Sequence, residues 1–425
     1  MLKKVSKLNC GLEGEITIPA DKSVSHRAVM FSSISRGKCI IKNFSSGADC
    51  HSTLNIFKQL GVDIDFIDEK TLSVDSDGVL KSSSSPLDAG NSGTTTRLIS
   101  GILAGQNFDS IIIGDDSLSK RPMKRIIEPL TMMGANIESV DGHAPLKIHG
   151  SKLRGINYSS NLASAQVKSC VLLAGLYAEG ETTFNEPYLS RNHTELLLDY
   201  LGANIKVNGN SVTVQHSELY AKNINIVGDI SSAAFFIVAG LIVPNSNFVI
   251  KNVGLNPTRT GIIDIVKRMN GQIEILNQHT ESGELLGDIR VQYNKNLKGC
   301  IIEGEDIPRL IDELPVIAVL ASQAEGQTIV KNAEDLRNKE SDRIKCIVSE
   351  LSKIGINITE TTDGFIVEGK TKIIGGTELE SYHDHRLAMS FYIAGLVSEQ
   401  EIGINGFEWT KISFPEFEEL FNELV

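Results

Sequence analysis

A short pattern that recurs along the chain constrains the fold more than any other feature of the sequence. The pattern is the end of a helix, a glycine turn and an alternating strand, and glycine is common where the backbone turns left-handed beyond a helix. Its copies lie at residues 60–64, 133–137, 201–205, 269–273 and 354–358. A second pattern falls between them, an apolar helix that closes in a turn of small or polar residues. Its copies lie at residues 28–37, 98–105, 171–180, 235–244, 316–326 and 388–398. Six copies at a spacing of roughly 70 residues predict an α/β protein built from repeated units.

The length and the incomplete sixth repeat predict how these units divide into domains. A chain of 425 residues exceeds the roughly 250–300 residues at which a single core stops growing, so two domains are expected. The last helix, 414–424, ends the chain without a glycine turn and strand. We expect the strand-like run 14–18, within the N-terminal segment 8–19, to fill that gap. One domain would then comprise residues 1–19 and 229–425, with both termini, and the other residues 20–228.

Charge and cysteine content exclude several classes of protein. The formal net charge of -12 argues against nucleic acid or an anionic membrane as the main partner. The chain shows neither a secretory signal nor an apolar stretch of about 18 residues. The six cysteines are far apart and form no CxxC pair, which is typical of reduced thiols. We therefore expect a cytoplasmic protein that acts on small molecules.

The residues that open the six apolar helices combine helix caps with cations. The openings are Asp21 to Arg27, Gly90 to Arg97, Ser164 to Ser169, Gly228 to Ser232, Asp312 to Pro315 and His383 to Arg386. Ser, Thr, Asp and Asn are good N-caps, so six capped helices would explain part of this pattern. Caps do not explain Lys22, Arg27, Arg97 and Arg386, because a cation in the first turn opposes the helix dipole. An anion bound between these cations and the helix N-termini would explain them.

Two further segments add charge to this set. Residues 115–125 carry four cations after the strand-like run 111–113, and residues 338–343 mix both signs. Either segment alone would be typical of a solvated surface. Together with the helix openings they place two carboxylates, Asp312 and Glu340, among many cations. Such an arrangement is suited to proton transfer beside bound phosphates.

Taken together, these segments resemble the enolpyruvyl transferase family, and in particular its branch that acts on shikimate 3-phosphate. The segments that carry the resemblance are Lys22 to Arg27, Gly90 to Thr94, Arg121-Pro122-Met123, Ser164-Ala165-Gln166, Asp312-Glu313, Glu340 to Arg343, Asp384-His385-Arg386 and Ser413-Phe414-Pro415. The resemblance implies two similar domains, each with three βαβαββ repeats in an inside-out α/β barrel. It also implies an active site in the cleft between the domains, which close on substrate like a clamp.

The resemblance further implies a reaction and its ligands. The enolpyruvyl group of phosphoenolpyruvate would move to the 5-hydroxyl of shikimate 3-phosphate, with release of phosphate, on the route to chorismate and aromatic amino acids. Shikimate 3-phosphate would contact Lys22, Ser23, Arg27, Ser164, Gln166, Arg191, Asp312 and Lys339. Phosphoenolpyruvate would contact Lys22, Asn91, Gly93, Arg121, Gln166, Arg343 and Arg386. Lys22, Asp312 and Glu340 would be catalytic, and neither a metal nor an organic cofactor is expected of this monomer.

Three positions depart from what many relatives carry. Ile412 stands where they have a Lys before the Ser413-Phe414-Pro415 segment, so the preceding Lys411 stays outside the expected ligand set as an open candidate. Ala165 replaces a Ser, and Leu98 replaces a Pro. These two features resemble a subgroup that includes glyphosate-tolerant members. Gly93 leaves room beside the phosphoenolpyruvate pocket, so tolerance does not follow from them.

Three other interpretations compete with this one. The sister enzyme transfers enolpyruvyl to UDP-N-acetylglucosamine and usually carries a Cys in the loop that here runs from Asp115 to Lys120 without one. A six-fold ring that encircles nucleic acid would need basic residues spread along its inner helices, whereas here they gather at helix starts. His383-Asp384-His385 has metal-binding residue types, but such a triplet without a third ligand is more often structural.

Overall fold

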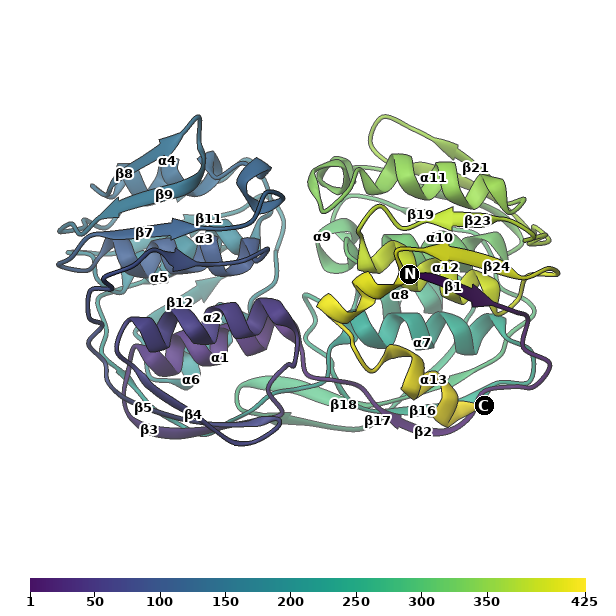
Figure 1. Ribbon diagram of the computed structural model, residues 1–425, viewed down its shortest axis with the longest axis horizontal. Helices are drawn as coiled ribbons and strands as arrows, with labels where there is room; N and C mark the ends of the chain where they lie inside the picture. The colour runs from purple at the N-terminus through teal and green to yellow at the C-terminus, as the bar shows by residue number, and fades with distance from the viewer. The chain divides into compact units, whose positions relative to one another are not determined.

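The computed structural model describes residues 1–425, which divide into two compact units (Figure 1). Unit 1 comprises Met1–Pro19, Gly228–His279 and Leu285–Val425, and unit 2 comprises Ala20–Val227 and Thr280–Glu284. Two details differ from the expected boundaries. Gly228 belongs to unit 1, because its N–H donates to the carbonyl of Asn252 at 2.8 Å. The segment Thr280–Glu284 belongs to unit 2, where the Asn225 N–H donates to Ser282 Oγ at 3.0 Å.

One repeat of unit 2 shows the common order of strand, helix, strand, helix, strand, strand. It consists of β6 (Leu87–Asp88), α3 (Gly93–Ala104), β7 (Ser110–Ile113), α4 (Lys124–Met132), β8 (Asn136–Val140) and β9 (His143–His149). Its sheet has the order β6-β7-β9-β8, in which β6 and β7 are parallel and the other pairs antiparallel. This is the predicted βαβαββ unit.

The other repeats of unit 2 follow the same plan. One has β10 (Asn157–Ser159), α5 (Ala165–Gly175), β11 (Thr182–Asn185), α6 (His193–Tyr200), β12 (Ile205–Asn208) and β13 (Ser211–Val214). The other has α1 (Lys22–Ser33), β3 (Ser35–Lys42), α2 (Ala48–Gln59), β4 (Asp63–Asp68) and β5 (Thr71–Asp77). Its parallel edge comes from the end of the unit, where β14 (Leu219–Tyr220) and β15 (Ile224–Asn225) pair with β3. The helix and turn predicted at residues 28–37 extend into β3, because α1 ends at Ser33 and Arg36 and Gly37 already pair with β5.

Unit 1 also has three repeats, of which the third has one strand fewer and forms a three-stranded sheet. Its first repeat has β2 (Glu13–Thr17), α7 (Ile230–Ile242), β16 (Asn247–Gly254), α8 (Gly261–Arg268), β17 (Gln272–Glu281) and β18 (Glu284–Gln292). Its second has β19 (Ile301–Ile302), α9 (Asp306–Leu310), α10 (Leu314–Ser322), β20 (Gly326–Val330), α11 (Arg343–Lys353), β21 (Asn357–Glu360) and β22 (Phe365–Gly369). Its third has β23 (Glu378–Glu380), α12 (His385–Gly395), β24 (Ile402–Asn405), α13 (Phe417–Leu424) and β1 (Leu2–Val5). Three short 3-10 helices are η1 (Leu118–Lys120), η2 (Glu334–Asn338) and η3 (Phe407–Ile412).

The N-terminal strands correct one expectation. The predicted run 14–18 does not complete the last repeat; β2 lies parallel to β16, with Ile16 opposite Ile250, in the first repeat of unit 1. The last sheet is instead completed by β1, which runs antiparallel to β24 with Val5 opposite Ile402. β1 is hard to recognise in the sequence because its four residues, Leu-Lys-Lys-Val, bury only the final Val.

The glycine turns occur where the repeat predicts them. The second residue after the second helix adopts positive φ in five repeats, and in four of them it is a glycine, which reaches this conformation without the steric cost that a Cβ imposes. The values are +88° at Gly61, +97° at Gly134, +93° at Gly202, +62° at Asn270 and +90° at Gly355. In every case a strand of the same repeat follows, so the turn fixes the direction in which the chain returns to its sheet.

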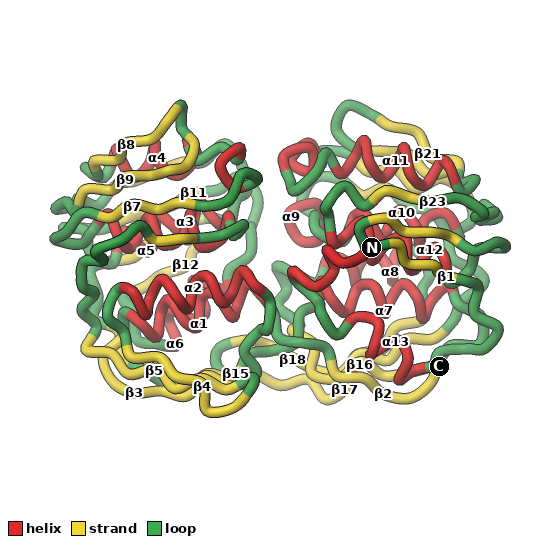
Figure 2. Tube along the Cα trace, viewed as in Figure 1, coloured by secondary structure: helices red, strands yellow, loops and turns green.

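The first helix of each repeat forms the interior of its unit, and the sheets lie on the outside (Figure 2). All 13 residues of α7 are buried, and the Phe236 ring stacks on Phe421 of α13 with a centroid distance of 4.3 Å. A helix that is apolar all round is expected when it is enclosed by other elements. No helix is long and apolar enough to cross a membrane.

Candidate active site

In unit 2 the N-termini of α1, α3 and α5 lie side by side. Each is capped by a side chain: Asp21 accepts from the Val24 N–H, Ser92 from the Thr95 N–H and Ser164 from the Val167 N–H. The N-terminal ends of helices carry a partial positive charge, equivalent to roughly half an elementary charge each. Three such ends at one place favour a negatively charged ligand.

A buried chain of hydrogen bonds joins α1 to α3. His26 Nδ1 lies 2.7 Å from Thr53 Oγ1, and Thr53 Oγ1 lies 2.7 Å from Thr95 Oγ1. Thr95 in turn donates to Ser92 Oγ at 2.7 Å. His26 has thus a structural role beside the site, and Thr53 and Thr95 fix the register between the two helices.

Side chains of α5 complete the connection. Gln166 accepts from Arg97 Nη1 at 2.6 Å and donates to Thr94 Oγ1 at 3.0 Å, which ties α5 to α3. Arg27 of α1 donates to Ser169 Oγ of α5 at 2.8 Å. The first helices of all three repeats are therefore locked to one another at the end where the predicted ligands lie.

Cations surround these helix ends. Lys22 pairs with Asp49 at 3.1 Å, and Arg121 Nη2 donates to Asn91 at 2.7 Å. A Cβ at Gly93 would lie 3.0 Å from Arg97 Nη1 and 3.5 Å from Arg121 Nη1, so two guanidinium groups flank the start of α3. The sequence marks Arg97 as a helix-opening cation but not as an expected ligand, because spacing alone does not show that its guanidinium lies next to Gly93.

Arg27 is buried, and its surroundings are charged. Burial lowers the pKa of Arg27 to about 10; Glu195 opposes this shift most strongly, and Arg191 adds to it. Arg191 therefore lies close enough for the two like charges to repel each other. Two cations held together in this way are suited to sharing an anion. We call the set Lys22, Ser23, Arg27, Asn91, Gly93, Arg121, Ser164, Gln166 and Arg191 the unit 2 cluster.

In unit 1 the central group is Arg343, the first residue of α11. Its Nε donates to Asp384 at 2.7 Å, its Nη2 to Glu340 at 2.6 Å, and its Nη1 lies 3.4 Å from Asp312. Burial would lower the pKa of Arg343, but Asp384, Glu340 and Asp312 together raise it above its ordinary value. Arg343 is therefore a permanent cation, and it holds three carboxylates in fixed positions.

Asp312 lies among three cations. Besides Arg343, its carboxylate is 3.7 Å from Lys339 Nζ and 3.9 Å from Arg386 Nη2. Arg386 also donates to the Asp312 carbonyl at 3.2 Å. The structure thus brings together all five residues predicted in this unit, and we call them the unit 1 cluster: Asp312, Lys339, Glu340, Arg343 and Arg386.

A buried network next to Asp312 joins two predicted helix openings through Arg259, which those openings do not include. Arg259 donates to Ser231 at 2.7 Å and lies 3.1 Å from Asp229, while Ser231 donates to Glu313 of the neighbouring repeat. A signal for Arg259 was available in the repeat itself. An Arg stands at or just before the second helix in four repeats, at Arg121, Arg191, Arg259 and Arg343.

Three other residues considered in the sequence, Lys411, His383 and Asp384, are not part of the two clusters. Lys411 is exposed in η3, and the His383 ring stacks on Trp409 at a centroid distance of 4.6 Å. Asp384 caps α12 by accepting from the Arg386 N–H at 2.9 Å, so it supports the cluster. No group of three or more His, Cys, Asp or Glu side chains has the arrangement of a metal site.

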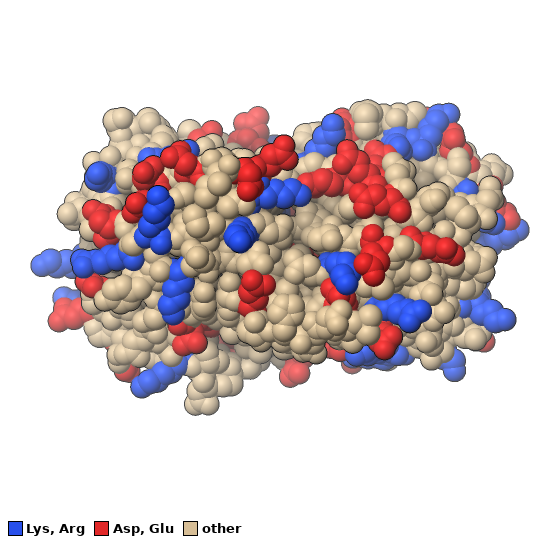
Figure 3. Space-filling model, turned by 90° about the horizontal axis from the view of Figure 1, so that it is seen from below, with Lys and Arg blue, Asp and Glu red and all other residues tan.

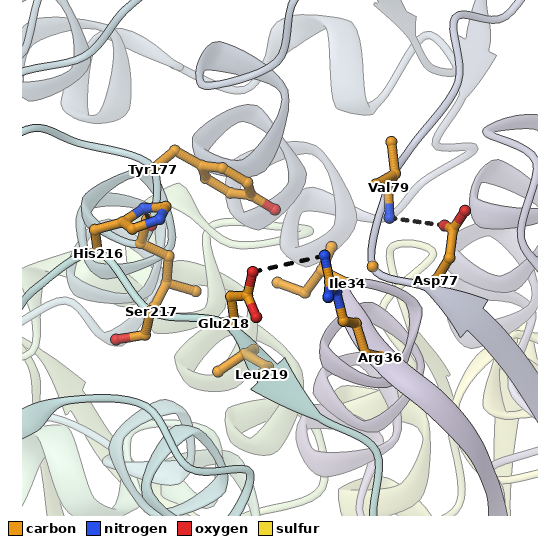
Figure 4. A pocket seen from close by; sticks show the side chains of 11 residues that line it. Ile34, Arg36, Asp77, Val79, Tyr177, His216, Ser217, Glu218 and Leu219 are labelled. Atoms are coloured by element: carbon orange, nitrogen blue, oxygen red, sulfur yellow. Dashed lines mark hydrogen bonds and ion pairs between the residues drawn. The ribbon is translucent and has the colours of Figure 1, made fainter.

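A separate pocket in unit 2 is no substitute for these clusters (Figure 4). It is lined by Arg36, Asp77, Tyr177, His216 and Glu218, among others, and by none of the predicted ligands. Arg36 lies 3.6 Å from Glu218, and Asp77 accepts from the Val79 N–H at 3.0 Å. Its one cation is therefore offset by two carboxylates.

The buried histidine predicts a pH dependence of stability. Burial lowers the pKa of His26 from 6.5 to about 3, so folded His26 stays neutral where the unfolded chain takes up a proton. Stability from this group is complete above pH 6.5 and is lost as pH falls below it, by about 1 kcal/mol between pH 7 and pH 5.5. Urea unfolding at both pH values should show a shallower loss for His26→Gln than for wild type. The exposed His279→Gln serves as control; equal pH slopes for wild type and His26→Gln would contradict the assignment.

Comparisons with known proteins agree with this geometry. The model of the family described as EPSP synthase (3-phosphoshikimate 1-carboxyvinyltransferase) matches residues 8–421. The 3-phosphoshikimate 1-carboxyvinyltransferase of Thermoanaerobacter sp. is 52% identical over 416 residues, which cover 97% of this chain and 98% of the relative. That of Thermodesulfovibrio yellowstonii is 51% identical over 430 residues and covers both chains completely.

Solved structures lead to the same family. EPSP synthase from Acinetobacter baumannii superposes with a TM-score of 0.90 at 43% identity and covers 100% of this chain and 98% of its own. The enolpyruvyl transferase NikO from Streptomyces tendae, at 18% identity and a TM-score of 0.81, shows the fold alone and covers 100% and 97%. The resemblance and the fold class inferred from the sequence are confirmed. The chain belongs to the EPSP synthase (3-phosphoshikimate 1-carboxyvinyltransferase) family.

Proposed function

We propose that the protein transfers the enolpyruvyl group of phosphoenolpyruvate to the 5-hydroxyl of shikimate 3-phosphate and releases phosphate. The observation that carries this proposal is that hydrogen bonds join the N-terminal ends of α1, α3 and α5, where Lys22, Arg27 and Arg121 lie. The two substrates together bring two phosphates and two carboxylates, which need such a concentration of positive charge. Relatives about half identical over nearly the whole chain carry the name of this activity.

We assign shikimate 3-phosphate to one part of the unit 2 cluster. Ser23, Ser164 and Arg191 would contact its phosphate or hydroxyls, and Arg27 its carboxylate. Gln166 and Lys22 would touch both substrates. From the unit 1 cluster, we assign Asp312 and Lys339 to the ring of shikimate 3-phosphate.

We assign phosphoenolpyruvate to Asn91, Gly93 and Arg121 of unit 2 and to Arg343 and Arg386 of unit 1. The two arginines of unit 1 would hold its carboxylate. A planar guanidinium can bind a carboxylate with two parallel hydrogen bonds, which an ammonium cannot do. Arg343 is already fixed by Asp384, so its orientation does not have to be set by the ligand.

The proposed chemistry is addition followed by elimination. The 5-hydroxyl oxygen attacks the central carbon of phosphoenolpyruvate and gives its proton to Asp312, with Lys22 nearby. Glu340 donates a proton to the methylene carbon, which becomes a methyl group in a tetrahedral adduct. The adduct then expels phosphate, assisted by Lys22, while the methyl group returns a proton to Glu340 and the vinyl bond re-forms. Positioned acids and bases together with fixed cations can supply these steps without a metal or cofactor.

The proposal also covers the oligomeric state, the location and the partners of the protein. We propose a monomer in the cytoplasm that binds neither nucleic acid nor membranes. On the face shown in Figure 3, Lys and Arg side chains are interspersed with Asp and Glu, which suits neither polyanion. The cations that matter are concentrated at helix starts inside each unit.

Phosphate release from phosphoenolpyruvate tests the proposal directly. The purified chain should release phosphate with shikimate 3-phosphate as acceptor and not with UDP-N-acetylglucosamine. Omission of either substrate should abolish release. Turnover with the nucleotide sugar alone would assign the chain to the sister activity, and no turnover with either acceptor would overturn the proposal.

A further inference from the structure

A fully buried group of three charged side chains lies beside the unit 2 cluster and has no part in the proposed chemistry. Lys168 of α5 contacts Glu186 at 2.7 Å and Glu195 of α6 at 2.7 Å. The side chains of Lys168 and Glu186 are 0% exposed and that of Glu195 is 3% exposed. We call these three residues the Lys168 triad.

The triad holds one peptide unit from two sides. The Ser190 N–H donates to Glu186 Oε1 at 2.9 Å, and Lys168 Nζ donates to the Ser190 carbonyl at 3.2 Å. Ser190 is itself buried, and the next residue is Arg191. The loop that carries Arg191 therefore has its backbone fixed immediately before the arginine.

The triad also reaches Arg27. Thr194, the neighbour of Glu195 in α6, accepts from Arg27 Nε at 2.7 Å and lies 2.6 Å from Ser169 Oγ. Glu195 is the strongest of the influences that keep Arg27 protonated against burial. Glu195 of the triad, together with Asp21 and Glu284, supplies the negative charge that offsets the repulsion between Arg27 and Arg191.

Stability alone does not account for this arrangement. Removing charges from water is expensive, and apolar or neutral residues of similar size often replace a buried ion pair without loss of stability. The triad does, however, fix geometry that an apolar cluster could not, because only polar groups can hold both sides of the Ser190 peptide. What the triad provides, and an apolar cluster would not, is a fixed position for Arg27 and Arg191.

We propose that Lys168 is a positioning residue for shikimate 3-phosphate: through the Ser190 peptide and Glu195 it holds Arg191 and Arg27 at the spacing that this substrate requires. Lys168 itself touches no substrate. This inference rests on the proposed function. It assigns the effect of the triad to the binding of shikimate 3-phosphate. The binding of phosphoenolpyruvate, which is assigned to Asn91, Gly93 and Arg121, should not depend on the triad.

Two variants of the full chain test the inference. The triple variant Lys168→Met, Glu186→Gln, Glu195→Gln removes all three charges of the triad and keeps an acceptor for the Ser190 N–H. The double variant Lys168→Met, Glu195→Gln keeps the net charge of the triad. We expect both to raise KM for shikimate 3-phosphate by roughly tenfold or more, because the loop loses a charged hydrogen bond. KM for phosphoenolpyruvate should change less than about twofold.

If the triad acted only through its net charge, the triple variant would have a lower KM for shikimate 3-phosphate than wild type. Its loss of one net negative charge next to cations would tighten anion binding, so a raised KM in both variants reports lost positioning. The control is Lys251→Met, which removes a lysine paired with Asp288 at 2.8 Å in unit 1. Titration calorimetry with shikimate 3-phosphate alone should show the same loss of affinity in the triad variants.

The outcomes separate the two proposals. If wild type and Lys251→Met release no phosphate, the proposed function fails, whatever the triad does. If they are active and the folded triad variants keep both KM values, or raise both equally, the positioning role is overturned. Failure of both variants to fold at 25 °C would assign the triad to stability and would overturn it as well.

Discussion

Glu340→Gln should lower kcat for phosphate release by roughly 100- to 10,000-fold, the range typical for removal of a positioned acid or base. Gln has nearly the same size and can still accept the hydrogen bond from Arg343 Nη2, which is 2.6 Å long in the wild type. It cannot give a proton to the methylene carbon or take one back. The unfolding free energy should therefore change little while turnover is lost.

Steady-state phosphate release and urea unfolding of the same preparations check this expectation. Glu303→Gln is a matched control, because Glu303 lies in the same unit, is half-exposed and pairs only with Lys331 at 3.2 Å. The control should keep wild-type kcat. A folded Glu340→Gln protein with nearly normal turnover would remove Glu340 from the proposed proton transfers.

Arg343→Lys should damage both stability and binding. The guanidinium contacts Asp384, Glu340 and Asp312 at once, and a single ammonium can satisfy only part of that set. Breaking a buried charge network by loss of one partner's contacts costs about 3 kcal/mol or more. KM for phosphoenolpyruvate should rise by roughly 100-fold, because its carboxylate loses a planar partner and a fixed neighbour.

The control for this variant is Arg337→Lys, in the same unit. Arg337 pairs with Asp342 at 3.0 Å and Glu360 at 2.8 Å, but its side chain is 27% exposed, so water can compensate. We expect less than about 1 kcal/mol from this change. Should Arg343→Lys unfold like Arg337→Lys and bind phosphoenolpyruvate normally, the central place given to Arg343 would be wrong.

Much of the fold could be predicted because it is repeated. The positive φ at Gly61 and at four equivalent positions follows from local chemistry, which the sequence displays directly. β1 could not be placed, because only Val5 of its four residues is buried and its pairing with β24 joins residues about four hundred positions apart. Periodicity locates elements along the chain, but it does not show which of the two N-terminal strands, β1 or β2, pairs with β24.

The residues of the candidate site likewise differ in how far the sequence predicts them. Lys22, Arg27 and Arg386 can be predicted because a cation at a helix start opposes the helix dipole and so needs an explanation, whereas Arg343 is predicted only by the family resemblance. The role of Lys168 could not be predicted, because nothing in a single sequence shows that a lysine in an apolar helix is buried against two glutamates. Such groups act through tertiary contacts, and a partner such as Glu186 lies outside the helix that carries the lysine.

The order of the strands has a consequence for synthesis on the ribosome. Unit 2 is nearly continuous and obtains its parallel edge when Leu219–Tyr220 and Ile224–Asn225 emerge to pair with β3. Unit 1 has to keep β1 and β2 unpaired through that whole period, and β1 finds its partner only after residue 402 has been made. Pairing over such long separations is slow, so newly made chains should pass through a state in which one half is native and the other still exposes apolar strand edges.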